Sequence, residues 1–325
     1  MKATVVTRDG SALRFALQDV SPPAPGANEL LIGVKAAGLN RADLIPSYPS
    51  RSTRKDGAVI AGRELAGVVL AFGAHAMGFA IGDRVMAMAE GAFAEQALVD
   101  HRLALRIPGG IDWAEAASIP VAFATAHDAM ITNGGLAKGE TVLVNAASSG
   151  VGVAALQIAR LKGAGLVVGT TGSASKLERL AGLGADLVID TGKENFADAI
   201  LAKTDNRGAD VIIDNVGKGV LADNIRVAAI KGRIVSVGRL GGNMDSLDLD
   251  ELARKRLKLI GVTFRTRTLD ERIAVARRFA EECLPAFSAG RLRALVHQTF
   301  PLADAPKALS AMKANAHVGK LVITA

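Results

Sequence analysis

Residues 142–152 have the sequence VLVNAASSGVG, and this stretch decides the fold. An apolar run typical of a strand leads into a turn of small residues, which opens a segment with helical spacing. Small residues let the backbone approach a pyrophosphate, and the first turn of a helix offers free N–H groups and a partial positive charge. The order of strand, turn and helix therefore predicts a dinucleotide-binding turn around Gly150 and Gly152.

The middle of the chain alternates between strand and helix patterns around this turn. Strands are expected at 141–145, 166–170, 187–189, 211–214 and 233–237, and helices at 150–162 and 175–183. This alternation predicts an α/β fold in which a doubly wound parallel sheet has helices on both faces.

The two ends of the chain have a different pattern. Residues 1–120 favour β structure, because short apolar runs at 2–7, 29–36, 66–72 and 83–88 lie between Gly, Pro and Asp residues. After about residue 262, the spacing predicts an amphipathic helix over 269–284 with Cys283 on its apolar stripe. A second helix is expected at 303–314, between two short strands.

The composition is that of a globular protein. Of the 325 residues, 50% are hydrophobic and 22% are charged, which excludes collagen and a disordered chain. Cys283 is the single cysteine, so neither an internal disulfide nor a multi-thiolate zinc site can form. No apolar run approaches the ~20 residues that span a bilayer, and the first ten residues favour a strand and turn over a signal peptide. We therefore expect a cytoplasmic protein without a membrane partner.

The formal net charge of +7 raises the question of an acidic partner. The basic residues are dispersed apart from a cluster at residues 254–258, and no aromatic residues interleave with that cluster. A nucleic-acid partner is therefore not favoured. A solvated basic face is the simpler explanation, and attraction of a polyanionic cofactor or substrate is the alternative.

The second expected strand bears on the choice of dinucleotide. An NAD site usually places Asp or Glu about 20 residues beyond the glycine turn, where the acid holds the ribose hydroxyls. Residues 168–176 have the sequence VGTTGSASK, which contains no acid. Ser173, Ser175 and Lys176 suit a 2′-phosphate instead, so the sequence predicts NADPH as the cofactor.

Several short motifs recur along the chain in a specific order. They are AAGLNRAD at 36–43, GRELAGVV at 62–69, GDRV at 82–85, EAASIP at 115–120 and GKLV at 319–322. Together with the 146–152 turn, they resemble the zinc-independent quinone oxidoreductases, the zeta-crystallin-like branch of the medium-chain dehydrogenase/reductase superfamily. The resemblance implies a β-rich, GroES-like catalytic domain of residues 1–120 and 263–325, a Rossmann domain of residues 121–262, a cleft between them, and a homodimer.

The same resemblance implies a set of cofactor contacts. The turn would contribute Ala147, Ser149, Gly150, Val151 and Gly152, and the 2′-phosphate would meet Ser173 and Lys176. The nicotinamide side would involve Thr125, Asn215, Val216, Gly217, Val237 and Gly238, and further phosphate contacts would fall on Asn315 and Lys320. Thr191 departs from the pattern, because many relatives carry a Tyr there beside the adenosine phosphate.

The metal ligands of zinc-dependent relatives are replaced in this chain. Those relatives place Cys at the position of Asn40 and His at the position of Arg63, and they carry a four-cysteine lobe that is missing here. Zinc needs several S, N or O donors that converge on one point. We therefore expect no catalytic metal.

Without a Lewis acid, hydride transfer from NADPH needs an acceptor that is already electrophilic. Quinones and α,β-unsaturated carbonyl compounds qualify, because the negative charge spreads onto a conjugated oxygen. Asn40 is the expected hydrogen-bond donor to that oxygen. Asp43 either orients Arg41 and the local backbone or is a structural turn acid.

Two further residues complete the expected catalytic set. Tyr48, on the loop at 44–58, either covers the cleft and supplies a proton or packs at the surface. Arg265, with Arg267, either lines the cleft or is a plain surface arginine.

The leading hypothesis is an NADPH-dependent, metal-free quinone reductase. The alternative with the same hydride chemistry is reduction of an activated C=C bond in an enone or enoyl thioester. An alternative of another class is a nucleic-acid-binding member of the fold. A polyketide-type reductase is also considered, although a free-standing chain of this length argues against an embedded module.

Overall fold

The computed structural model describes residues 1–9, 12–45 and 59–325. Tyr48 and the rest of the loop at 46–58 lie outside the described residues. The chain forms two compact units, one of Met1–Val121 with Leu269–Ala325 and the other of Ala122–Thr268. From the sequence, the Rossmann domain was expected to end at residue 262, whereas the second unit of the structure ends at Thr268. Arg267 keeps that segment with the second unit, because its Nη2 lies 2.6 Å from Asp128 Oδ2.

The first unit is built from two sheets. Its small sheet has the order β2-β1-β4, and its larger sheet has the order β15-β16-β3-β5-β6-β8, with β7 paired to β3. The strands of the small sheet are β1 (Lys2–Asp9), β2 (Ala12–Asp19) and β4 (Val59–Ile60). Those of the larger sheet are β3 (Glu29–Gly38), β5 (Glu64–Phe72), β6 (Arg84–Met88), β7 (Gln96–Asp100), β8 (Ala104–Arg106), β15 (Val296–Pro301) and β16 (Lys320–Thr324).

Both ends of the chain contribute to this larger sheet. β16 pairs antiparallel with β3, and Val322 lies opposite Gly38. The helical segments of the unit are η1 (Arg41–Leu44), α1 (Trp113–Ala116), α8 (Leu269–Ser288), η4 (Leu302–Asp304) and α9 (Ala305–Ala314). Cys283 is fully buried on the apolar face of α8, as predicted.

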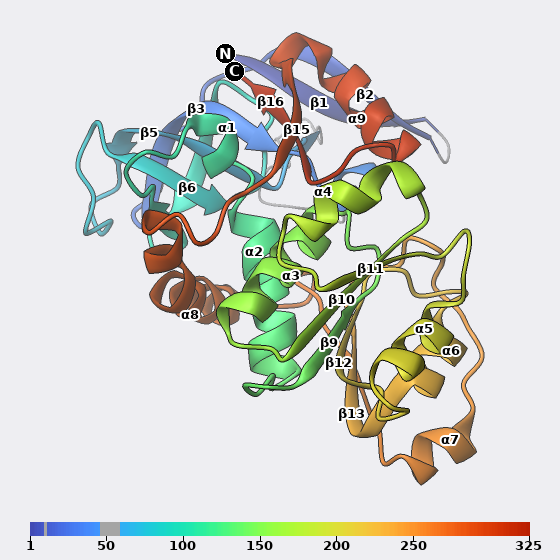
Figure 1. Ribbon diagram of the computed structural model, residues 1–325. Coiled ribbons are helices and arrows are strands. Elements are labelled where there is room, and N and C mark those ends of the chain that lie inside the picture. Colours follow the sequence, from blue (N-terminus) through green and yellow to red (C-terminus); the bar gives the residue numbers. More distant parts are fainter. Residues whose placement is uncertain (10–11, 46–58) are drawn as a thin grey trace. The chain divides into compact units, whose positions relative to one another are not determined.

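The second unit contains a parallel sheet with the order β11-β10-β9-β12-β13-β14 (Figure 1). Its strands are β9 (Thr141–Val144), β10 (Leu166–Thr171), β11 (Leu187–Asp190), β12 (Ala209–Asp214), β13 (Ala228–Ser236) and β14 (Lys258–Gly261). From β9, the chain adds β10 and β11 on one side of the sheet. It then returns to the other side of β9, where it adds β12, β13 and β14. In a doubly wound sheet, this reversal opens a crevice at the carboxyl ends of the strands.

Helices surround this sheet. They are α2 (Pro120–His127), which begins at the boundary of the units, the π-helix η2 (Asp128–Asn133), α3 (Gly150–Leu161), η3 (Ala174–Lys176), α4 (Leu177–Ala181), α5 (Phe196–Lys203), α6 (Leu221–Val227) and α7 (Leu249–Arg254). The predicted α/β fold class is therefore confirmed. No helix in the described part of the chain is long and apolar enough to cross a bilayer.

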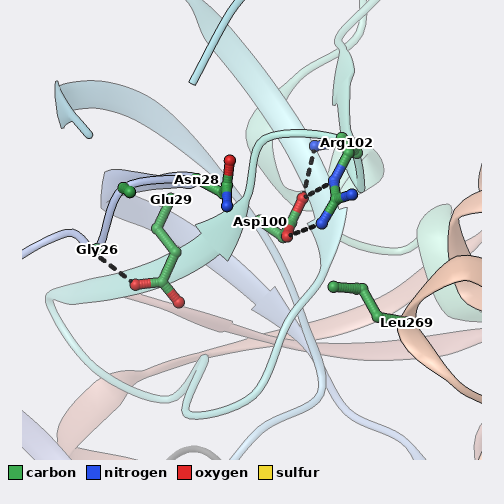
Figure 2. Close-up of a pocket in the computed structure, with 7 residues that line it drawn as sticks. Gly26, Asn28, Glu29, Asp100, Arg102 and Leu269 are labelled. Carbon is green, nitrogen blue, oxygen red and sulfur yellow. Dashed lines mark hydrogen bonds and ion pairs between the residues drawn. The ribbon is translucent and has the colours of Figure 1, made fainter. Parts of the chain in front are cut away.

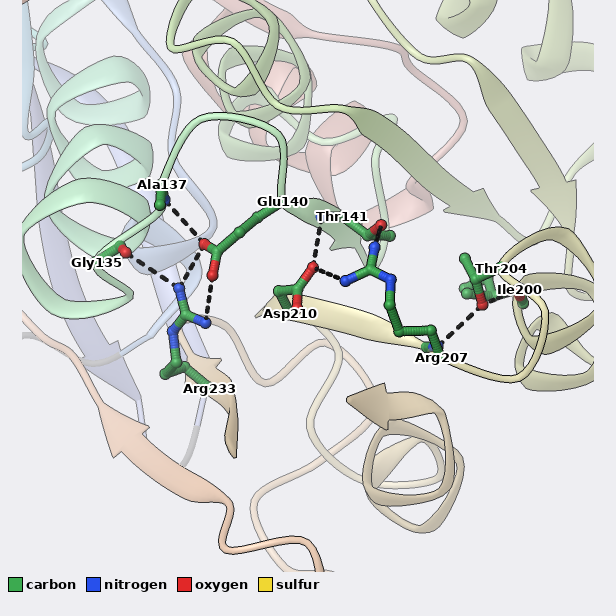
Figure 3. Close-up of polar contacts among 10 residues, drawn as sticks. Gly135, Ala137, Glu140, Thr141, Ile200, Thr204, Arg207, Asp210 and Arg233 are labelled. Carbon is green, nitrogen blue, oxygen red and sulfur yellow. Dashed lines mark hydrogen bonds and ion pairs between the residues drawn. The ribbon is translucent and has the colours of Figure 1, made fainter. Parts of the chain in front are cut away.

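Ion pairs join the strands at the amino ends of the sheet (Figure 3). Arg233 Nη2 lies 2.6 Å from Glu140 Oε2, just before β9, and Arg207 Nη1 lies 2.7 Å from Asp210 Oδ2 on β12. Asp210 also accepts the backbone N–H of Thr141 at 2.7 Å. These charged groups are therefore satisfied by one another at the amino ends of the sheet.

Candidate functional site

The turn between β9 and α3 is tight because of its side chains and its glycine. Ser149 caps α3, since its Oγ accepts the Gly152 N–H at 3.0 Å and its hydroxyl donates to Ala146 O at 2.9 Å. A Cβ on Gly152 would lie 2.6 Å from Ala146 O and from Ala147 Cα. Only glycine permits this approach of the helix to the strand. Ser149 stands at a turn position where glycine is commoner in relatives, and it fits there because its side chain caps the helix.

A network of buried amides fixes the strand ends beneath the turn. Asn145 donates through Nδ2 to Asn224 Oδ1 at 2.7 Å, and its Oδ1 accepts the Thr170 hydroxyl at 3.2 Å. Asn215 Nδ2 donates to the Asn145 carbonyl at 2.9 Å. The network joins the carboxyl ends of β9, β10 and β12 to α6. Asn215 was predicted from the sequence, whereas Asn145 and Asn224 were not. An Asn directly after the apolar run VLV is a signal for a position such as that of Asn145.

Asp214 organises the loop that follows β12. Its Oδ1 accepts the N–H groups of Val216 and Gly217 at 2.8 and 3.0 Å. Burial raises the pKa of the Asp214 carboxyl, and these two N–H groups oppose that shift. The Asp214 carbonyl in turn accepts the N–H groups of Val237 and Gly238. The structure therefore brings residues 215–217 and 237–238 together, and their contact with the cofactor stays a prediction.

A cavity of about 330 Å³ lies at the carboxyl ends of the strands. Its walls come from the ends of β9, β10, β11 and β12 and from the starts of α5 and α6. They consist of Ala146, Thr170, Thr171, Gly172, Thr191, Glu194, Asn195, Phe196, Val216, Gly219, Val220 and Asp223. Val216 is the predicted cofactor residue among them. Thr191 is the position that the resemblance placed beside the adenosine phosphate. The wall residues at the starts of α5 and α6 were not predicted, because these two helices were not assigned from the sequence.

Ser173 and Lys176 lie together just beyond β10. Ser173 Oγ and Ser175 Oγ are 2.8 Å apart, and the Lys176 backbone N–H donates to Ser173 O at 3.1 Å. Lys176 is only 8% exposed, and burial lowers the pKa of its ammonium group. A bound anion would favour the charged form of such a lysine.

Lys320 occupies a buried polar cluster in the first unit. Its Nζ donates to Glu64 Oε1 and Leu39 O at 2.5 Å each and to Asn40 Oδ1 at 2.9 Å. An ammonium group has three N–H bonds, and all three are used here. A phosphate contact from Lys320 would require one of these bonds to break, and the predicted phosphate role of Lys320 stays a prediction.

Asn40 belongs to the same cluster. Its Nδ2 donates to Glu64 Oε1 at 2.9 Å and to Gly38 O at 3.3 Å, so both amide N–H groups are used inside the unit. Asn40 thus holds the Glu64 carboxylate. The expected donation from Asn40 to a substrate oxygen would require one of these hydrogen bonds to break, and it stays a prediction.

Asp43 caps the short helix η1. Its Oδ2 accepts the Asn40 backbone N–H at 2.8 Å, and its Oδ1 lies 3.4 Å from Arg63 Nε. Burial raises the pKa of the Asp43 carboxyl to about 6, and the Arg63 charge opposes the shift. Of the two expected alternatives, these contacts favour the structural turn acid.

The remaining predicted residues have different surroundings. Arg265 is exposed, whereas Arg267 pairs with Asp128 and its Cζ lies 5.0 Å from the centroid of the Phe264 ring. Asn315 ends α9 in the left-handed conformation with φ 58, a helix-terminating role. Thr125 lies within α2. The binding roles of Arg265, Asn315 and Thr125 stay predictions.

A second cavity, of about 230 Å³, lies in the first unit (Figure 2). Its charged groups already have hydrogen-bond partners within the unit. Arg102 donates to both Asp100 oxygens at 2.9 Å, and Glu29 accepts the Gly26 N–H at 2.9 Å. We assign no ligand to this cavity.

Within the described residues, no three His, Cys, Asp or Glu side chains converge as a metal site would require.

Comparison with protein families identifies the chain. Residues 150–281 match the family described as zinc-binding dehydrogenase, and residues 26–109 match the alcohol dehydrogenase GroES-like domain. This chain belongs to the medium-chain dehydrogenase/reductase superfamily. Within it, the chain is similar to quinone oxidoreductases. The family description mentions zinc, but this chain has Asn40 and Arg63 at the positions where the resemblance places zinc ligands.

Solved structures of this superfamily cover the whole chain. The mycobacterial protein Rv1454c, solved in complex with NADPH, is 27% identical, with a TM-score of 0.88 over 100% of both chains. A quinone oxidoreductase of Pseudomonas syringae pv. Tomato DC3000 is 26% identical, also with a TM-score of 0.88 over 100% of both chains.

The curated relatives are much longer than this chain. Erythronolide synthase EryA2 of Saccharopolyspora erythraea is 34% identical over 98% of this chain, which spans 9% of that relative. The spectinabilin polyketide synthase system protein NorB of Streptomyces orinoci is 33% identical over 98% of this chain and 14% of the relative. The medium-chain reductase sequence therefore matches a small segment of these synthases.

Proposed function

We propose that this medium-chain reductase uses NADPH to reduce a conjugated carbonyl compound, with a quinone as the first acceptor to test. The observation that carries the proposal is the cavity at the carboxyl ends of β9, β10 and β12, beside a turn that only Gly152 permits. The full-length similarity to a solved NADPH complex supports the cofactor.

The residues around the cavity fit a dinucleotide phosphate. The start of α3 would face the pyrophosphate with the N–H groups that follow Ser149. The end of β10 carries Thr170 and Thr171 and no acid, which favours a 2′-phosphate over free ribose hydroxyls. Ser173 and Lys176 would hold that phosphate, and its charge would offset the cost of burying the lysine.

The chemistry then divides between cofactor, acceptor and protein. NADPH, when bound, supplies the hydride, and the acceptor carries the resulting negative charge on its conjugated oxygen. The residues of this chain orient the reactants. Asp214 holds loop 215–217, and the buried amides of Asn145 and Asn215 fix the strand ends that form the site.

A second acceptor has its own support. The two curated relatives described above belong to polyketide synthases, and an enoyl thioester is the conjugated acceptor that thioester-bound chain assembly would present. Reduction of an activated C=C bond is therefore the second candidate function. A homodimer stays a proposal carried by the family resemblance. A cytoplasmic location stays a proposal that rests on the single cysteine and the pattern of apolar runs in the sequence.

A nucleic-acid-binding role has less support. Arg254 pairs with Glu251 at 2.7 Å, and Lys255 donates to the carbonyls of Ile225, Arg226 and Ala228 at the end of α6. The basic cluster is thus partly used in holding its own helices.

The test follows NADPH oxidation by absorbance against a benzoquinone, a naphthoquinone, a simple enone and a crotonyl thioester, with and without a chelator. Chelator-resistant turnover with NADPH, and much slower turnover with NADH, is the expected result. The relative rates choose between quinone and C=C reduction. Binding of NADPH without turnover of any acceptor would contradict the proposed reaction.

A further inference from the structure

We infer that Asp223 selects the adenine base of the cofactor by accepting a hydrogen bond from its exocyclic amine. The inference rests on the proposed use of NADPH and concerns the cavity of about 330 Å³ at the carboxyl ends of the parallel strands. It assigns a function to a carboxylate that the proposed hydride transfer does not require.

The cavity has the character of a base-binding site. Phe196, Val216 and Val220 give it apolar walls, and Phe196 is only 4% exposed where α5 begins. Small-molecule sites are mostly apolar, and a few fixed polar groups orient the ligand within them. A planar heteroaromatic base suits these walls, and Asp223 is a polar group at their rim.

Asp223 is held firmly in one orientation. Its Oδ2 accepts the Asn195 Nδ2 hydrogen at 3.0 Å, and its Oδ1 accepts from Arg226 Nε and Nη2 at 3.3 and 3.2 Å. Asn195 cannot turn its amide over, because its Oδ1 caps α5 by accepting the backbone N–H groups of Ala197 and Asp198. Arg226 is fixed in turn by Asp198 Oδ1, 2.6 Å from its Nη1.

The Asp223 carboxylate can accept a further hydrogen bond from a ligand in the cavity. Among the described residues, Asp223 Oδ2 accepts only the hydrogen bond from Asn195, and a carboxylate oxygen can accept two. A carboxylate can only accept hydrogen bonds, and it repels phosphates. The exocyclic amine of adenine supplies an N–H, whereas hypoxanthine carries a carbonyl oxygen at that position and would place one acceptor against another.

The test compares the binding of NADPH with that of its reduced hypoxanthine analogue, by the fluorescence of the bound nicotinamide. The wild-type protein should bind NADPH about ten-fold or more tightly than the analogue. Asp223→Asn should reduce this preference to less than about three-fold, because an amide can donate to the hypoxanthine oxygen. Asp198→Asn is the matched control, since Asp198 shares Arg226 but does not line the cavity, and it should keep the preference.

The possible outcomes separate the inference from the proposed function. Failure of the wild-type protein to bind NADPH would overturn both. Equal binding of the two dinucleotides by the wild type would overturn the inference alone, and this comparison needs no variant to fold. An equal loss of both dinucleotides in Asp223→Asn, with the base preference unchanged, would place the contact on a ribose hydroxyl and overturn the base assignment.

Discussion

Lys320 Nζ lies 2.5 Å from Glu64 Oε1, and the two side chains are 5% and 0% exposed. The pair joins β16, near the end of the chain, to β5 within the first unit. Two buried charges repay their desolvation only when they stay paired and hydrogen-bonded. Asn40 and the Val121 N–H complete the hydrogen bonding of Glu64.

Removal of one partner should therefore be costly. Glu64→Gln or Lys320→Met would leave one buried charge uncompensated, and each should lower the free energy of unfolding by about 3–5 kcal/mol. The double variant should lose less than the sum of the two, because neither charge is then stranded. Urea unfolding of the three variants measures this. The exposed pair Lys2 and Asp19 is the control, and Lys2→Met should leave the midpoint within error. Single variants with the wild-type midpoint would contradict the argument.

Asp43 should make stability depend on pH. Burial raises the pKa of its carboxyl from 3.8 to about 6, so the folded state keeps a proton that the unfolded state has already lost. Stability from this group is complete below about pH 4 and falls as the pH rises towards 6, by at most about 3 kcal/mol.

The measurement is the free energy of unfolding of the wild type and of Asp43→Asn between pH 4 and 7. Asp43→Asn should remove much of the decline, because an amide does not titrate. Asp250→Asn, on the exposed part of α7, is the control and should follow the wild-type curve. A decline that is equally steep in Asp43→Asn would assign the pH dependence to other groups.

Lys176 should distinguish the two dinucleotides. If its ammonium group meets a 2′-phosphate, Lys176→Ala should weaken NADPH binding about ten-fold or more and change NADH binding by less than about three-fold. Fluorescence titration with both cofactors measures the two dissociation constants. Lys203→Ala, at the end of α5, serves as a control lysine that does not line the cavity. An equal loss for both cofactors in Lys176→Ala would refute the 2′-phosphate contact.

Part of the candidate site could be predicted from short stretches of the sequence. The turn at 142–152 and the absence of an acid at 168–176 depend on neighbouring residues, so the periodicity and the small side chains predicted them. The edge strand β14 was missed, because its four residues lie beside a basic cluster and are largely exposed.

Long-range contacts account for the rest. Lys320 and Glu64 are 256 positions apart, so no local pattern indicated that the lysine was already paired. The cavity wall at Phe196 and Asp223 forms only when the starts of α5 and α6 meet beside the sheet ends. The side chains of Asn195 and Arg226 connect these two helices by a hydrogen bond. The residues next to them in the sequence do not indicate that the two side chains pair.

Gly152 tests the geometry of the turn itself. A Cβ at this position would lie 2.6 Å from Ala146 O and from Ala147 Cα, both of them backbone atoms that cannot move independently of the turn. Gly152→Ala should therefore shift the start of α3, lower the free energy of unfolding by about 1–3 kcal/mol and weaken NADPH binding about ten-fold or more. Gly182→Ala is the matched control, because its φ of −68 is ordinary and the nearest atom to its Cβ is 4.0 Å away. Thermal unfolding and NADPH titration of both variants measure the two effects. Wild-type affinity in a folded Gly152→Ala protein would mean that the cofactor does not depend on this approach of helix to strand.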